Sequence, residues 1–152
     1  MPRNEHSLSR IAKSGSLIVA AVALLAACSG CSKDPFACAP VSGLVTLDGE
    51  PLKTARVIFT PEKKGDNAIV GPVSFCITDD QGQFELNTNT GKPGAMIGKH
   101  KVFICGEVRD EENPDVILVK EYLPARYYEG TELTFEVPDY GTDEANFALT
   151  SK

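Results

Sequence analysis

The sequence predicts an all-β domain, a β-sandwich of seven short antiparallel strands. Three observations support this fold class. After residue 40, apolar side chains alternate with polar ones at a period of two. The alternating runs are separated by turns rich in Gly, Pro, Asn and Asp. No segment in this region has the long 3.6-residue apolar period of a helix that packs on a core.

Four of the predicted strands lie in the first half of this region. Their inward-facing residues are expected to be Val41, Gly43, Val45 and Leu47, then Ala55, Val57 and Phe59, then Val73, Phe75 and Ile77, and finally Phe84 and Leu86. Asp48 and Gly49 predict a tight turn after the first strand. Asp79 is expected to cap the turn before the fourth strand, with Gly82 at positive φ. Gly43, inside a strand, indicates a bulge or a close approach of another backbone.

The third and fourth strands are expected to form a hairpin. Its inward pairs would be Ile77 with Phe84 and Phe75 with Leu86, and its outward residues Cys76 and Glu85.

Three more strands are predicted in the second half. Their inward-facing residues are expected to be His100, Val102 and Ile104, then Leu133, Phe135 and Val137, and finally Phe147 and Leu149. Residues 89–98 contain three Gly and one Pro and are interpreted as a loop. Residues 108–124 form the longest irregular stretch, and the apolar run 116–119 within it is a candidate for an extra strand. The core is expected to contain Phe59, Phe84, Val102 and Phe135.

The composition excludes several classes of function. The chain has 152 residues, enough for one domain, and a net charge of −6, which argues against nucleic-acid binding because phosphates require a basic surface. Of its two His residues, His6 lies in an N-terminal targeting segment, and His100 is expected to pack near a strand start rather than to catalyse. The sequence therefore predicts no catalytic residue, no metal site and no cofactor.

Two acidic groups have an alternative interpretation as calcium ligands. Asp79 and Asp80 are followed at once by Gln81-Gly82-Gln83, which lacks the alternating oxygen ligands of an EF-hand, so a turn is favoured. The group at 110–115 could hold calcium weakly, and a solvated loop is the favoured interpretation.

Residues 1–27 are predicted to be a signal peptide. Basic residues precede an apolar run of eleven residues, from Leu17 to Ala27, which is too short to cross about 30 Å of hydrocarbon as a helix. The segment Leu25-Ala26-Ala27-Cys28 resembles the lipobox of bacterial lipoproteins. This resemblance implies cleavage before Cys28 and attachment of a diacylglyceryl group to its thiol. The alternative is an ordinary signal peptide with an incidental Cys, and Cys31 is a poorer lipidation site.

Residues 28–40 are predicted to be a flexible tether between the lipid and the domain. They contain Gly30, Pro35 and Pro40 and have no periodic pattern. The sandwich is expected to span residues 41–150. Ser29 beside Cys28 implies, by the same resemblance, a place in the cell envelope at the outer membrane, facing the periplasm.

Four thiols remain after lipidation, and an exported chain meets oxidising conditions. A Cys31–Cys38 disulfide would close a short loop in the tether, and a Cys76–Cys105 disulfide would join two strands. Four free thiols are the alternative, because strand adjacency cannot be read from one sequence.

Several motifs of the domain resemble carboxypeptidase regulatory-like domains. Residues 41–52 (VSGLVTLDGEPL) look like the opening of such a domain, and residues 78–84 (TDDQGQF) like its central hairpin. Residues 123–127 and 146–149 are similar to the corresponding parts of small bacterial lipoproteins that carry one such domain. The resemblance covers about residues 41–150. It implies a transthyretin-like, or Ig-like, Greek-key sandwich with a structural or binding role and no enzyme activity.

The leading hypothesis is a non-catalytic, lipid-anchored envelope protein, held at the membrane by its lipid, whose sandwich binds or spaces a protein or polysaccharide of the envelope. The alternatives are a transthyretin-like hydrolase, which would need polar residues converging at one end of the sandwich, and an accessory of export or assembly. A partner is expected at loop 109–128, because no outward sheet face is predicted to carry a run of aromatics. The contacting residues would be Asp110, Glu111, Glu112, Asp115, Tyr122 and Tyr128. For Tyr127, packing on the sandwich is an equal alternative.

Overall fold

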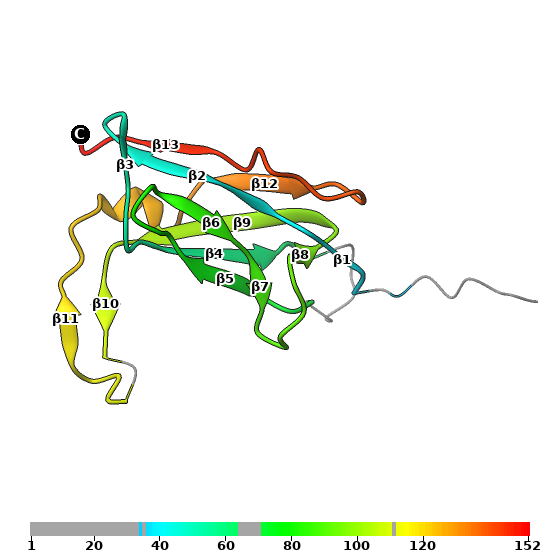
Figure 1. Ribbon diagram of the computed structural model, residues 1–152, viewed down its shortest axis with the longest axis horizontal. Coiled ribbons are helices and arrows are strands. Elements are labelled where there is room, and N and C mark those ends of the chain that lie inside the picture. The colour runs from blue at the N-terminus through cyan, green and yellow to red at the C-terminus, as the bar shows by residue number, and fades with distance from the viewer. Residues whose placement is uncertain (1–33, 35, 64–70, 111) are drawn as a thin grey trace, which may run out of the picture. The chain divides into compact units, whose positions relative to one another are not determined.

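The computed structural model describes residues 34, 36–63, 71–110 and 112–152 (Figure 1). The predicted signal peptide, Cys28 and Cys31 lie outside the described residues. Within them the backbone forms strands and a single-turn 3-10 helix, η2 (Ala125–Tyr127). The strands are β1 (Cys38–Ala39), β2 (Ser42–Leu47), β3 (Glu50–Pro51), β4 (Arg56–Pro61), β5 (Ser74–Ile77), β6 (Gln83–Glu85), β7 (Asn87–Thr88), β8 (Ala95–Met96), β9 (Gly98–Cys105), β10 (Val108–Arg109), β11 (Ile117–Val119), β12 (Thr134–Val137) and β13 (Phe147–Leu149).

The longer strands belong to two sheets. One sheet has the order β12-β9-β4-β5-β7, and its pairings are all antiparallel. In the other sheet β2 lies between β13 and β3 and also pairs with β6. In Figure 1, β2 and β13 lie in the upper layer, and β4 and β5 lie in the lower one. The predicted all-β fold with antiparallel sheets is confirmed.

Two details of the predicted topology are wrong. The thirteen strands of the described residues outnumber the predicted seven, because short strands extend the larger sheets at β3 and β7 and form two separate two-stranded sheets, β1 with β8 and β10 with β11. β13 also runs parallel, not antiparallel, to β2. Gly43 in β2 permits this pairing, since a Cβ at that position would collide with the backbone carbonyl of Ala145 just before β13. The expected close backbone approach at Gly43 is therefore confirmed.

The core lies between the sheets, and its centre is aromatic. The ring of Phe59 on β4 lies 5.7 Å from the rings of His100 and Phe135 and 6.0 Å from that of Phe147, measured between centroids. The predicted inward residues of β4 and β9 are fully buried, and Phe84 is buried as well, whereas Phe135 is only partly buried. His100 packs in the core near the start of β9, as expected.

The predicted inward face of β5 is wrong. The side chains of Phe75 and Ile77 are 48% and 50% exposed, while Ser74 and Thr78 are buried. Thr78 explains the choice of face: its hydroxyl accepts the N–H of Ala55 at 2.9 Å and donates to the carbonyl of Leu52 at 2.6 Å. These bonds satisfy buried backbone groups at the entry to β4, and an apolar side chain at position 78 could not make them.

The predicted hairpin of the third and fourth strands is also absent from the described residues. Ile77 does not lie opposite Phe84, because β5 pairs with β4 and β7, whereas β6 pairs with β2. The turn between them carries the chain from one sheet to the other. Its predicted chemistry is confirmed: the Asp79 carboxylate accepts the N–H groups of Gln81 and Gln83, and Gly82 has a φ of 72°.

The predicted boundary between tether and sandwich is wrong. Cys38 and Ala39, assigned to the tether, form β1 and pair with β8 inside the predicted loop 89–98. Ala39 is 2% exposed, and a Cβ at Gly94 would collide with its carbonyl. The folded unit therefore includes residues before Val41, and it runs from Asp34 to Lys152.

The predicted disulfide between Cys76 and Cys105 is wrong, and both thiols are free. β4 lies between their strands, so the two Cα atoms are about 10 Å apart by strand spacing, beyond the reach of a disulfide. The two side chains also lie on opposite faces, since Cys76 pairs with inward Val57 and Cys105 with outward Arg56. Burial raises the pKa of the Cys76 thiol to about 12.

Candidate binding surface

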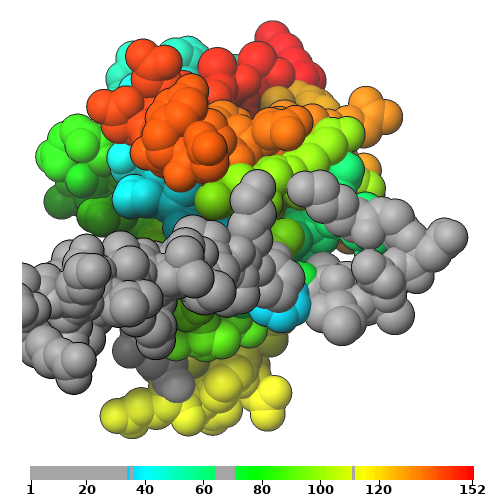
Figure 2. Space-filling model, turned by 90° about the vertical axis from the view of Figure 1, so that its right-hand side faces the viewer, coloured from blue at the N-terminus to red at the C-terminus, as the bar shows by residue number. Residues whose placement is uncertain are grey.

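A two-stranded ribbon of β10 and β11 projects from one end of the sandwich (Figure 1). It follows β9 directly, and it contains the apolar run that was a candidate for an extra strand, which is confirmed. Asp110 closes the ribbon: its carboxylate accepts the N–H groups of Glu112 and Asn113 at 3.0 and 2.8 Å, and its own N–H donates to the carbonyl of Val116. Figure 2 shows the yellow tip of the ribbon beyond the body of the domain.

The ribbon exposes an unusual amount of apolar surface. Leu118 is 59% exposed, and its neighbours Val116, Ile117 and Val119 are between 43% and 45% exposed. β10 and β11 pair only with each other, so the outer edges of both strands are free of strand partners among the described residues. Contiguous exposed apolar residues on strands with a free edge are typical of interaction sites.

The outward side of the five-stranded sheet, here called the outer face, carries a second apolar surface. Phe75 on β5, Ile58 on β4 and Phe103 on β9 are Cα partners and form one apolar row across three strands. The next row consists of Ile77, Arg56 and Cys105. The outer face therefore carries an apolar row, with two aromatics separated by Ile58, that the sequence did not predict.

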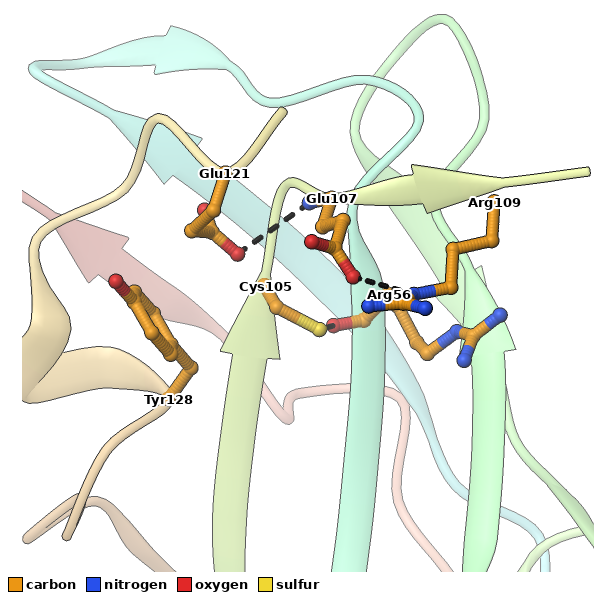
Figure 3. Close-up of a pocket in the computed structure, with 6 residues that line it drawn as sticks. All are labelled: Arg56, Cys105, Glu107, Arg109, Glu121 and Tyr128. Atoms are coloured by element: carbon orange, nitrogen blue, oxygen red, sulfur yellow. Dashed lines mark hydrogen bonds and ion pairs between the residues drawn. The ribbon is translucent and has the colours of Figure 1, made fainter. Parts of the chain in front are cut away.

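A hollow of about 270 Å³, here called the corner hollow, lies where the ribbon leaves the outer face (Figure 3). Arg56 and Cys105 contribute the outer-face side of the hollow, and Glu107 and Arg109 contribute the ribbon side. Glu121 and Tyr128 close it from the segment that returns to the sandwich. The ribbon and the outer face therefore form two sides of one concave corner.

Glu121 holds the base of the ribbon. Its carboxylate accepts the N–H groups of Gly106, Glu107, Tyr122 and Leu123, at distances of 2.8 to 3.3 Å. Such charge-assisted bonds are stronger than neutral ones. The ring of Tyr122 packs on Gly106, so a Cβ at position 106 would displace this ring. Glu121 thus ties the end of β9 to the irregular segment that follows β11.

Arg109 stiffens the same region. Its Nε lies 2.6 Å from the Glu107 carboxylate, and its Nη1 donates to the carbonyl of Pro114 at 3.0 Å. Arg109 is the cross-strand partner of Ile117, next to a register shift in the ribbon, and its side chain lines the hollow.

Two ionisable groups of the corner hollow, Cys105 and Tyr128, are held in their neutral forms. Burial, and then the charge of Glu121, raises the pKa of the Cys105 thiol, so the reactive thiolate is disfavoured. Partial burial and nearby carboxylates raise the pKa of Tyr128, which therefore remains a neutral hydrogen-bond donor. The six lining residues include no His to serve as a base. The arrangement suits polar contact with a bound surface.

The predicted partner residues fall into three groups. Glu112 and Asp115 are exposed near the ribbon tip, while Asp110 caps the turn and Glu111 lies outside the described residues. Tyr128 lines the corner hollow, and Tyr122 is half exposed over Gly106. Tyr127 packs on the sandwich, and its hydroxyl accepts the N–H of Thr150 at 2.9 Å.

The sequence reasoning missed the outer-face residues Ile58 and Phe103. A signal was available, because each is an apolar residue at an outward position between two inward ones. It also missed Glu121, whose partners are backbone groups and leave no side-chain pattern in the sequence.

The described residues contain no cluster of three or more His, Cys, Asp or Glu that could hold a metal ion. Among the described residues, no helix has the length and apolarity needed to cross a bilayer. The chain matches no protein-family model, no curated protein and no solved structure. The resemblance to carboxypeptidase regulatory-like domains therefore stays a prediction.

Proposed function

We propose that this chain is a lipid-anchored protein of the bacterial cell envelope that binds a protein partner through its ribbon and outer face. The observation that carries the proposal is a pair of apolar surfaces, the ribbon and the outer face, which lie on either side of the polar corner hollow. A soluble domain rarely leaves such surfaces uncovered, because burying them against a partner lowers the free energy.

A protein is a better fit to this surface than a small molecule or a polysaccharide. The hollow is small, at about 270 Å³. The apolar residues lie outside it, across three strands of the outer face and along the ribbon. Extended apolar surfaces with a polar, charged rim are typical of protein interfaces. A hydrolase draws no support from the hollow, where Glu107 pairs with Arg109 and Glu121 is committed to backbone groups.

The location rests on the N-terminal sequence. The lipobox-like Leu25-Ala26-Ala27-Cys28 supports lipidation at Cys28, and Ser29 supports transfer to the outer membrane with the domain facing the periplasm. Two acyl chains give stable anchoring where one is marginal.

Site-specific photo-crosslinking in living cells tests the binding surface. A crosslinking amino acid at Leu118 on the ribbon, or at Phe75 on the outer face, is expected to capture a defined protein. The matched control is Tyr140, which is 85% exposed. Tyr140 follows the end of β12, which pairs with the start of β9, whereas the ribbon follows the end of β9. Equal capture from Leu118 and Tyr140, or none from Leu118 and Phe75, contradicts the proposal.

A further inference from the structure

The ribbon and the outer face differ in charge. Glu112 and Asp115 lie exposed near the ribbon tip, and the described residues offer neither of them an ion-pair partner. The outer face carries Arg56, Lys99 and Lys101 on its paired strands, and two carboxylates lie near Lys99: Glu136 is its cross-strand partner, and Glu62, just after β4, is its ion-pair partner. The ribbon tip is therefore acidic, and the part of the outer face around Arg56 and Lys101 is basic.

The cations of the outer face are largely available. Lys99 pairs with Glu62 at 3.3 Å, but Arg56 and Lys101 have no ion-pair partner among the described residues. Lys101 pairs across the strands with Thr60 and Thr134, so no carboxylate stands directly opposite it. An acidic partner segment could approach both cations without displacing an existing ion pair.

The ribbon does not cover its own outer face, and hydrogen bonds hold its base in place. Glu121 fixes its base through four backbone N–H groups, and Arg109 ties β10 to Pro114. The corner hollow keeps a space between the ribbon and the strands beneath it. The two surfaces complement each other in charge and in apolar character, yet within one molecule they stay apart.

From these observations we infer that the partner at this surface is a second copy of this chain. Two copies related by a two-fold axis would each place the ribbon on the outer face of the other. Leu118 would then lie against the apolar row of Phe75, Ile58 and Phe103, and the carboxylates of Glu112 and Asp115 would lie near Lys101 and Arg56 of the other copy.

A two-fold arrangement uses the same surface twice, as closed homodimers do. A specific interface buries about 800 Å² on each partner around an apolar centre. Phe75, Ile77 and the four apolar residues of the ribbon supply that centre, and the unpaired charges supply its rim. The inference rests on the proposed function, because it names the partner of the same surface.

Disulfide trapping between differently tagged copies tests the inference. One full-length copy carries Leu118→Cys and the other Phe75→Cys, and both are expressed together and oxidised in the membrane. The expected result is a mixed dimer, enriched at least tenfold over the control pair of Leu118→Cys with Tyr140→Cys. The unsubstituted chain controls for disulfides of its own cysteines.

A charge exchange supplies the second measurement. Lys101→Glu is expected to lower the yield of mixed dimer several-fold, and adding Asp115→Lys to the same chains is expected to restore it. Restoration by a second substitution excludes unfolding as the cause of the first loss.

Two other outcomes overturn the inference. If the yield of mixed dimer does not exceed that of the control pair, while photo-crosslinking from Leu118 captures a different protein, the partner is not a second copy of this chain. The proposed function then stands. If neither method joins Leu118 to any protein, both the inference and the proposed function are wrong.

Discussion

Both carboxylate oxygens of Glu121 lie 3.0 Å from the backbone nitrogen of Gly106, fifteen residues earlier in the chain. This contact joins the two ends of the segment that contains the ribbon, because Gly106 directly follows β9 and Glu121 lies just after β11. The Glu121 side chain is therefore a main determinant of the position of the ribbon relative to the outer face.

Glu121→Gln is expected to loosen the ribbon without unfolding the sandwich. The amide offers one acceptor oxygen and no charge, so several charge-assisted bonds weaken, at about 1.5–3 kcal/mol each before compensation by water. Amide hydrogen exchange at Gly106 and Leu123 should accelerate at least tenfold, while exchange at Val57 and Ile104 stays slow. Glu112→Gln, at an exposed position, serves as the control and should change neither.

Phe59→Ala and Phe75→Ala form a matched pair that tests the assignment of faces. Phe59 is fully buried among three aromatic rings, so its truncation should cost about 3–5 kcal/mol of unfolding free energy. Phe75 is 48% exposed, so its truncation should cost less than about 1.5 kcal/mol. Urea denaturation measures both. Similar losses for the two variants would place Phe75 in the core and contradict the observed face of β5.

The alternation of apolar residues predicted β4 and β9 correctly and β5 incorrectly, and the difference has a physical cause. In the two central strands the inward positions hold Val57, Phe59, Val102 and Ile104, so burial and pattern agree. In β5 the larger apolar residues lie outward, because the hydroxyl of Thr78 is needed inside to satisfy the backbone at the entry to β4. A pattern of apolar residues does not predict a hydrogen bond between residues that are more than twenty positions apart in the sequence.

The candidate surface was predicted only in part, for a similar reason. The acidic tip and the tyrosines were visible as residue types, and Glu112, Asp115 and Tyr128 do lie at the ribbon tip or in the corner hollow. The apolar row of the outer face depends on the register between strands, which single-sequence patterns do not specify.

His100 is expected to make the domain less stable in mild acid. Its Nδ1 donates to the carbonyl of Gly98 at 2.9 Å, and its Nε2 is buried without a hydrogen-bond partner among the described residues. Burial lowers the pKa of this imidazole, although the Gly98 carbonyl and the charge of Glu62 oppose the shift. The folded state therefore binds a proton less readily than the unfolded state, and stability falls as pH drops below about 6.5, the pKa of an unfolded His.

Chemical denaturation of the wild type and of His100→Phe at pH 7.5, 6.5 and 5.5 measures this dependence. The wild type should lose up to about 1.4 kcal/mol more per pH unit than the variant below pH 6.5, where one proton is taken up on unfolding. The variant keeps an aromatic ring beside Phe59 and lacks the titrating group. Parallel pH profiles for the two proteins would show that His100 does not contribute.

Cys28→Ala is expected to abolish lipidation. In cells labelled with a fatty acid, the wild-type chain should carry label and partition into the membrane fraction, because a diacyl anchor holds it there. The variant should lose both properties. Cys31→Ala is the matched control, three residues away, and should retain both. If the Cys28→Ala chain still carries label, the lipid is attached to another residue and the lipobox interpretation is wrong.

Replacing Glu112 and Asp115 together by Ser is expected to separate binding from stability. Both side chains are exposed and have no ion-pair partner among the described residues, so the melting temperature should change by no more than a few degrees. Photo-crosslinking from Leu118 should nevertheless weaken severalfold at low salt and less at high salt, because screening already reduces the attraction of these charges for Lys101 and Arg56 of a partner copy. Asp110→Ala provides the contrast, because it removes the cap that holds the N–H groups of Glu112 and Asn113 and should disorder the tip at every salt concentration. Crosslinking that is unchanged by the double replacement at all salt concentrations would mean that the charges at the ribbon tip do not steer the partner.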